Sequence, residues 1–363
     1  MRIGEVTGEE GALMPGKTLT AGADEVVGRV AGAVLAAIRA ETGPTQEELA
    51  EQLQVGLSTV QAWESGRRPL VRASFQDVQR LNRRLRLNGA APGLLHVLDQ
   101  ALLADSIYND MATGPAGEHP LSLLVPDRTL TELLAWPLAG PPPRQLPRRA
   151  RLHVASGVRD AVATDLQKAA DQPAADERSA MIRRQVKFLV ADNAASQEWL
   201  RERAATDVRA QPDLRSWSPY WAVARSQAVS SAHAGDPEPL RRFIRHGLSD
   251  DVGIQANLNY WAYWVGEHTA PWSADADMTR PTDPWSGERL LDSLIDGAVH
   301  APYRELCAHA LWSLLRHRRH LLRRPQVAGR VEAAAAHALD VAGLDGDAAR
   351  RLEQVRYLAE SAG

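Results

Sequence analysis

Residues 44–69 read PTQEELAEQLQVGLSTVQAWESGRRP, and this stretch predicts two short helices joined by a tight turn. Thr45 and Glu48 have the spacing of a capping box, in which each side chain bonds the other residue's backbone N–H at a helix start. Ala50 and Leu53 fall on one side of this first helix, so we expect that side to be buried. The small Ala50 would let a second helix cross closely, as in a helix-turn-helix unit.

The predicted second helix covers residues 57–65, and Gly66 is expected to end it in the left-handed conformation. At about 100° per residue, Thr59, Val60 and Trp63 turn towards the protein. The opposite side carries short or uncharged side chains: Leu57, Ser58, Gln61, Ala62 and Ser65. Ser and Gln can hydrogen-bond base edges, and Leu and Ala can contact thymine methyl groups. This side therefore fits the major groove of double-stranded DNA.

Seven arginines and two acidic residues between Leu57 and Leu87 give a local net charge of +5, although the whole chain of 363 residues carries −3. The arginines are Arg67, Arg68, Arg72, Arg80, Arg83, Arg84 and Arg86. A local basic patch on an acidic chain favours phosphate contacts without indiscriminate coating of DNA. Lys occurs only three times in the chain, so arginine supplies nearly all of its basic residues. A high number of arginines is therefore expected anywhere in this chain, and their position carries more weight. The alternative is a hairpin that merely packs in an oligomerisation module.

The motifs TQEELA, V-x-x-S-T-V and W-E-S-G-R-R-P resemble the Xre type of helix-turn-helix domain, the class of Cro and the phage repressors. The resemblance covers about residues 24–87 and implies a lambda-repressor-like domain of five helices that regulates transcription. It implies that Gln46 contacts phosphate and braces the recognition helix, and that Arg39 and Glu64 form a structural ion pair. It assigns base reading to Leu57, Ser58 and Ala62, with Gln61 beside them, backbone contacts to Ser65 and Arg67, and a groove-reaching position to Arg68.

Two positions depart from that family pattern. Gly56 stands where a Ser or Thr N-cap is usual, and glycine caps only moderately well. Leu57 stands where a polar reader is common, so direct hydrogen-bond readout is expected to be thin.

The rest of the chain divides by composition. Residues 1–23 are rich in glycine and read as a disordered arm before a DNA-binding domain at 24–110. The helix expected around residues 94–107 is very apolar and either docks on the preceding helices or pairs with its copy in a dimer. Eight prolines mark 111–150 as a linker. Within that linker, residues 127–136 form a short helix with a capping box at Thr129 and Glu132.

Residues 151–363 show helical periodicity throughout, so the protein is expected to be all-α, with antiparallel helix pairs in a layered array. Degenerate tetratricopeptide or HEAT-like repeats are one interpretation of this region, which we expect to serve dimerisation or effector sensing. Its segments ANLNYWAYWVGE (256–267) and HALWSLLRHRRHLL (309–322) resemble long helix-turn-helix regulators of high-GC Gram-positive bacteria. The rings of Tyr260, Trp261, Tyr263 and Trp264 either fill the helical core or line a pocket for a small-molecule or peptide effector.

Several kinds of chemistry find no support in the sequence. The single cysteine, Cys307, excludes an internal disulfide framework and fits a reducing cytoplasm. His317 and His320 lie three residues apart, but neighbouring arginines would repel a metal ion. Phosphate loops, nucleophile elbows and membrane-spanning runs are absent from the pattern. We therefore expect neither enzymatic activity nor a cofactor or metal.

The sequence as a whole predicts a cytoplasmic homodimer that binds double-stranded DNA and regulates transcription. A second hypothesis is a helical scaffold for a protein or peptide, localised to DNA by its N-terminal domain.

Overall fold

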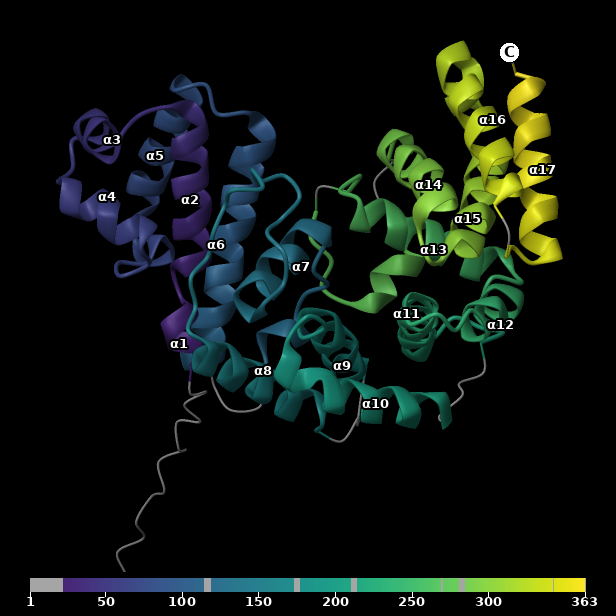
Figure 1. Ribbon diagram of the computed structural model, residues 1–363, viewed down its shortest axis with the longest axis horizontal. Helices are drawn as coiled ribbons and strands as arrows, with labels where there is room; N and C mark the ends of the chain where they lie inside the picture. Colours follow the sequence, from purple (N-terminus) through teal and green to yellow (C-terminus); the bar gives the residue numbers. More distant parts are fainter. Residues whose placement is uncertain are drawn as a thin grey trace, which may run out of the picture.

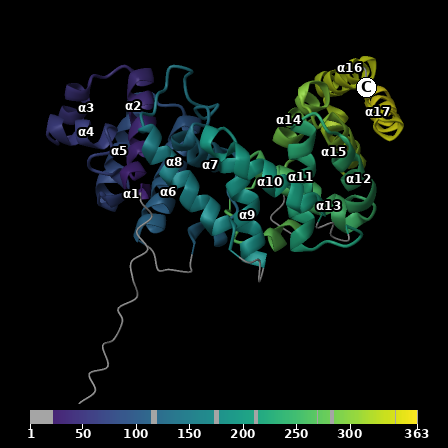
Figure 2. The ribbon, with the colours of Figure 1, turned by 60° about the horizontal axis from the view of Figure 1, so that its bottom comes forward.

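The computed structural model describes residues 22–113, 119–172, 177–209, 214–268, 270–280, 285–341 and 343–362. Within these ranges every named element is a helix, and the one extended pairing is an isolated antiparallel bridge between Val125 and Trp272. The fold is all-α, as predicted. Figures 1 and 2 show an elongated molecule with the N-terminal helices at one end and the C-terminal helices at the other.

The N-terminal part begins with six helices: α1 (Ala23–Val26), α2 (Arg29–Thr42), α3 (Gln46–Leu53), α4 (Leu57–Glu64), α5 (Phe75–Leu87) and α6 (Pro92–Thr113). Of the expected disordered arm, residues 1–21 lie outside the described residues. The end of that arm is corrected, because Ala23 is fully buried and begins α1. The capping box at Thr45 and Glu48 forms as predicted, and both of its hydrogen bonds are present.

The apolar helix α6 docks on α1 and α2 within the same chain. Leu98, Ala101 and Ile107 are all buried in this contact. Each Å² of apolar surface that this packing takes out of water stabilises the fold by about 25 cal/mol. The docking alternative therefore holds for these side chains, while Leu94 and Leu102 on the same helix are half-buried.

The proline-rich stretch that we expected to be a linker packs mainly into the N-terminal core over residues 119–150, although Val125 within it belongs to the C-terminal core. It contains α7 (Arg128–Ala135), whose Leu133 and Leu134 are buried. The start of α7 also differs from the expectation, because Asp127 caps it by accepting a hydrogen bond from the Leu130 N–H. Proline prevents regular hydrogen bonding but does not prevent burial of the apolar residues between the prolines.

The boundary expected at residue 151 does not divide the cores. Two helices beyond it, α8 (Ser156–Ala170) and α9 (Glu177–Leu189), place Val162, Leu166 and Val186 in the N-terminal core. The buried side chain of Met181, also on α9, belongs to the C-terminal core instead. The helix α9 thus joins two cores, and α10 (Gln197–Arg209) follows it.

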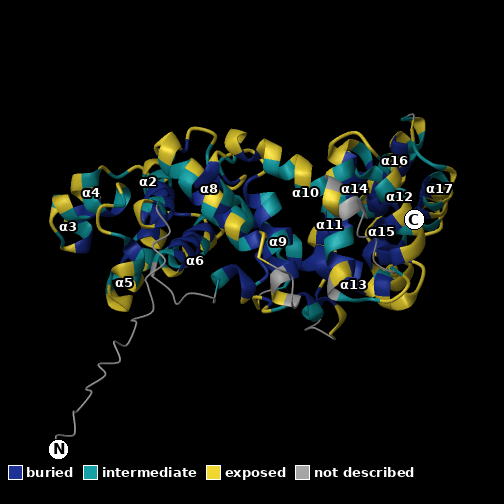
Figure 3. Ribbon diagram, turned by 90° about the horizontal axis from the view of Figure 1, so that it is seen from below, coloured by how far each residue is buried: buried dark blue, intermediate teal, exposed yellow. Residues whose placement is uncertain are grey.

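The C-terminal core is built by seven further helices: α11 (Pro219–His233), α12 (Glu238–Gly247), α13 (Asp251–Trp264), α14 (Glu288–His300), α15 (Arg304–His317), α16 (Pro325–Asp340) and α17 (Gly346–Glu360). Consecutive helices pack on each other in the pairs α11 with α12, α14 with α15, and α16 with α17. Figure 3 shows buried residues running through both ends of the molecule. No helix in the described ranges is long and apolar enough to cross a membrane.

Candidate nucleic-acid interface

The helix α4, which covers the expected recognition helix, lies at the outer end of the N-terminal part, beside α3 (Figures 1 and 3). Gly56 is its N-cap residue and contributes no side-chain bond, while Gly66 has a φ of 75° beyond its end. The Arg68 N–H donates to the Ala62 carbonyl at 3.1 Å and so closes the C-terminal turn. Glycine at the left-handed position avoids the Cβ penalty that other residues would meet.

The rotation of α4 determines which side chains can reach a ligand. Val60 is fully buried and Trp63 is 4% exposed, so these two residues hold the helix against the protein. The side chains that face solvent or its margin are the expected set, of which Ser58, Gln61 and Ser65 are exposed and Leu57 and Ala62 are half-buried. Leu57 packs partly against the N-terminal core, which leaves less of it for a base.

A close helix crossing fixes α4 on α2. Gly32 lies in α2, and a Cβ built on it would come within 2.5 Å of the Trp63 carbonyl oxygen and 2.7 Å of the Glu64 carbonyl oxygen. Real Cβ atoms essentially never approach so closely. The two helices can therefore cross at this distance only because position 32 lacks a side chain.

A polar network connects α2, α3 and α4. Arg39 donates from Nε to one Glu64 carboxylate oxygen at 2.6 Å and from Nη2 to the other at 3.1 Å. Gln46 donates from Nε2 to the same carboxylate at 2.6 Å. The Glu64 side chain is only 7% exposed, and bidentate Arg–carboxylate pairs are strong and geometrically specific. The Glu64 carboxylate therefore receives both the predicted ion pair from Arg39 and the hydrogen bond by which Gln46 braces α4.

The arginines that follow α4 do not all remain available. Arg67 and Arg68 are exposed, and the Nε of Arg67 donates to the Ser65 hydroxyl at 3.3 Å. Arg72 differs from our expectation of a phosphate-facing residue, because its Nη2 bonds Asp24 at 3.3 Å and Asn109 at 3.0 Å. Arg67 and Arg68 are thus the exposed arginines that directly follow α4.

Sequence reasoning missed the residue that caps the helix α2. Asp105, on α6, accepts hydrogen bonds from the backbone N–H groups of Val30 at 3.3 Å and Ala31 at 3.0 Å. Its carboxyl group is fully buried, and this desolvation raises its pKa from 3.8 to about 7, although the backbone hydrogen bonds act in the opposite direction. The available signal was an acidic residue on the apolar side of the predicted helix 94–107.

The aromatic group on α13 lies mostly in the C-terminal core. Tyr260, Trp261 and Tyr263 are buried, and Trp264 is half-buried. Tyr260 and Trp264 border a cavity of about 10 Å³, close to the minimum that holds one water molecule. The rings fill space between helices, in agreement with the alternative that they belong to the helical core. An effector site at these rings stays a prediction.

Beside this aromatic group, a buried ion pair attaches the segment 270–280 to the core. Arg184 on α9 donates from Nη2 to Asp275 at 2.5 Å and from Nη1 to the Tyr260 hydroxyl at 3.3 Å. Both charged side chains are at most 3% exposed. Each charge offsets the desolvation of the other, so the pair has to form for this segment to pack.

Comparison with known proteins adds one finding on this region. A family model described as a helix-turn-helix domain matches residues 30–91, which include most of α2 and all of α3, α4 and α5. The N-terminal part therefore contains a helix-turn-helix domain, the class of fold that typically binds DNA. No curated protein and no solved structure matches the chain.

Proposed function

We propose that this protein is a sequence-specific DNA-binding transcription regulator of the Xre type that places α4 in the major groove. The observation that carries this proposal is the orientation of α4. Its apolar residues Val60 and Trp63 are buried, whereas Ser58 and Gln61 are exposed on an uncharged surface. Side chains of this kind can distinguish base edges in the major groove.

The residues around α4 receive distinct roles in this proposal. Ser58 and Gln61 read bases by hydrogen bonds, and Leu57 and Ala62 provide apolar contacts from their half-buried positions. Exposed Arg67, together with Ser65, binds phosphate oxygens, and Arg68 reaches towards the groove. Gln46 uses one of its two amide N–H donors on Glu64, so it braces α4 and can offer the second N–H to a phosphate oxygen.

We further propose that the protein acts as a homodimer on two half-sites about one helical turn apart. A recognition helix of eight residues reads few base pairs, and a second copy would multiply the specificity. Leu98, Ala101 and Ile107 on α6 are already buried, which favours a dimer contact through other surfaces. The separate C-terminal core supports a further role in setting dimer geometry or in sensing an effector.

Recovery and sequencing of genomic fragments bound by the full chain would test this function. The expected result is a recurring motif with two related halves. Absence of any preferred sequence at moderate ionic strength would refute the proposal.

Substitutions would then test the assigned roles on the recovered site. Gln61→Ala should change which base is preferred at one position, with a cost of about 1–3 kcal/mol on the original site. Arg67→Gln should weaken binding to all sequences and lower the salt dependence by about one phosphate contact. Arg330→Gln is the matched control, because Arg330 lies on α16 and pairs with Asp292 on the surface. Equal effects of the first two variants on sequence preference would contradict the roles.

A further inference from the structure

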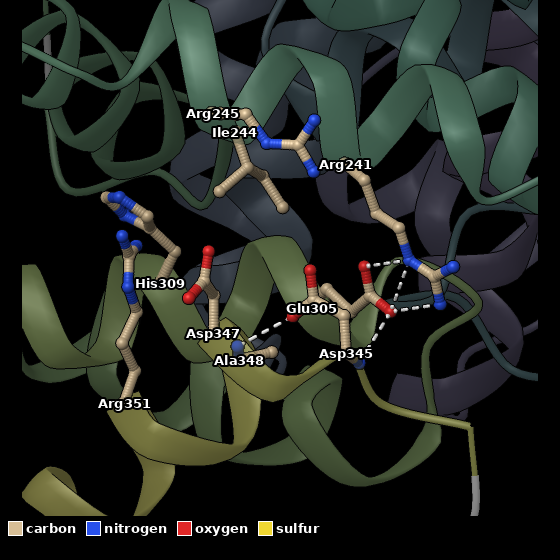
Figure 4. Close-up of a pocket in the computed structure, with 9 residues that line it drawn as sticks. All are labelled: Arg241, Ile244, Arg245, Glu305, His309, Asp345, Asp347, Ala348 and Arg351. Atoms are coloured by element: carbon tan, nitrogen blue, oxygen red, sulfur yellow. Dashed lines mark hydrogen bonds and ion pairs between the residues drawn. The ribbon is translucent and has the colours of Figure 1, made fainter.

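A small cavity lies between α12, α15 and the beginning of α17 (Figure 4). Arg241 and Arg245 border it from α12, Glu305 and His309 from α15, and Arg351 from α17. The volume open to the centres of water molecules is about 30 Å³, whereas one water needs about 10–15 Å³. The cavity therefore accommodates two water-sized atoms, such as the two oxygens of a carboxylate.

The acidic side chains at this cavity already have partners. Glu305 accepts hydrogen bonds from Arg241 at 2.8 and 3.1 Å and from the Asp345 N–H at 3.2 Å. Asp345 caps α17 by accepting from the Ala348 N–H at 2.7 Å. Asp347 pairs with Arg350, a residue that does not line the cavity. Arg241 and Arg350 thus offset the charges of Glu305 and Asp347, and Asp345 bonds a backbone N–H. None of these contacts uses Arg245 or Arg351.

Two nitrogen atoms at one end of the cavity are buried and have no hydrogen-bond partner. They are Nε2 of His309, whose side chain is 1% exposed, and Nη1 of Arg351. Figure 4 shows the imidazole of His309 and the guanidinium of Arg351 lying together, away from the Arg241–Glu305 pair. Leaving a buried donor unsatisfied costs about 1–3 kcal/mol, and more for a charged group. This end of the cavity is thus incomplete within the chain itself.

The hydrogen bonds of His309 indicate which of its two ring nitrogens carries a proton. The Ser313 hydroxyl donates to the His309 carbonyl oxygen at 2.9 Å, so its oxygen is free to accept from Nδ1, which lies 3.3 Å away. With Nδ1 as a donor, Nε2 of the neutral imidazole is an acceptor, and it donates only when the ring is also protonated, a state that a bound anion would favour. Burial lowers the pKa of Arg351, whose guanidinium lies over the Trp312 ring at 5.1 Å from its centroid. Both groups would gain from a negatively charged partner.

We propose that this cavity binds a small oxyanion, with one oxygen between His309 and Arg351 and the exposed Arg245 attracting the anion at the rim. Charge-assisted hydrogen bonds from arginine and protonated histidine suit a carboxylate or phosphate group. A metal ion is disfavoured because Glu305 and Asp347 already pair with arginines, and the described residues contain no cluster of potential metal ligands. The proposal concerns ligand binding alone and does not depend on DNA binding.

Isothermal titration of the full chain with acetate, and separately with inorganic phosphate, tests the proposal. We expect one of the two anions to bind saturably at one site per chain. Binding of acetate would identify the ligand as a carboxylate, and binding of phosphate would identify it as a phosphoryl group. Arg351→Gln should weaken binding at least about tenfold, because it removes one charge-assisted hydrogen bond. Arg245→Gln should also weaken it, and this exposed side chain can change without risk to the fold. Asp347→Asn should strengthen it by removing a negative charge from the lining.

Arg356→Gln provides the matched control on the same helix, because Arg356 pairs with Glu360 and does not border the cavity. It should leave the affinity unchanged. If neither anion binds saturably, the cavity holds water only and the proposal is overturned. It is also overturned if Arg245→Gln and Arg351→Gln bind as the unsubstituted protein does, or if the control weakens binding equally.

Discussion

Substitution of Gly32 by alanine sets two physical effects against each other. Within a helix, alanine is favoured over glycine by about 1 kcal/mol, which alone would stabilise α2. At position 32, however, the new Cβ would lie 2.5 Å from the Trp63 carbonyl oxygen. An ordinary carbon–oxygen contact is about 3.3 Å, so the end of α4 would have to move by about 0.8 Å. Overpacking of this kind costs about 1–3 kcal/mol, and we expect destabilisation to prevail.

Gly329→Ala supplies the control, since Gly329 lies inside α16 and a Cβ there would meet nothing within 4 Å. That variant should be stabilised by roughly 0.5–1 kcal/mol. Hydrogen exchange followed by mass spectrometry would report the opening free energy of peptides covering α4 and α16. We expect faster exchange across α4 in Gly32→Ala, together with weaker DNA binding. Slower or unchanged exchange in α4 would refute the inferred crossing of α2 and α4.

Three further outcomes follow from buried polar groups. Glu64→Ala leaves Arg39 without its bidentate partner and should lower the free energy of unfolding by about 2–4 kcal/mol in chemical denaturation; a change below about 0.5 kcal/mol would contradict the proposed bracing. The raised pKa of Asp105 means that its folded form holds a proton more tightly than its unfolded form, so its stabilising contribution is full below pH 3.8 and is lost as the pH rises through about 7. The stability of the unsubstituted protein relative to Asp105→Asn should therefore fall between pH 4 and 7 by up to about 4 kcal/mol, and a flat difference would disprove this titration. Asp275→Ala strands the Arg184 cation in the core and should cost about 3–5 kcal/mol, measured as a lower Tm; an unchanged Tm would show that this pair does not hold the segment 270–280.

Local patterns were sufficient to predict most helices. The capping box at Thr45 and the turn at the left-handed Gly66 depend on residues within six positions of each other, so the sequence contains the whole interaction. The burial of Val60 and Trp63 likewise follows from helical periodicity once the helix is assumed. Those features are enough to orient the exposed side of α4.

Contacts between distant residues were decided only by the tertiary structure. Asp105 reaches the start of α2 across 74 residues, and Arg72 bonds Asp24 and Asn109, which are far from it in the sequence. The proline-rich stretch and α8 and α9 join the N-terminal core, although their composition indicated a boundary near residue 151. Helical periodicity states which side of a helix is apolar but not which partner covers it. The amino-acid sequence therefore determined the helices and the outward side of α4, whereas the choice of partners, and with it the division into cores, arose from packing in three dimensions.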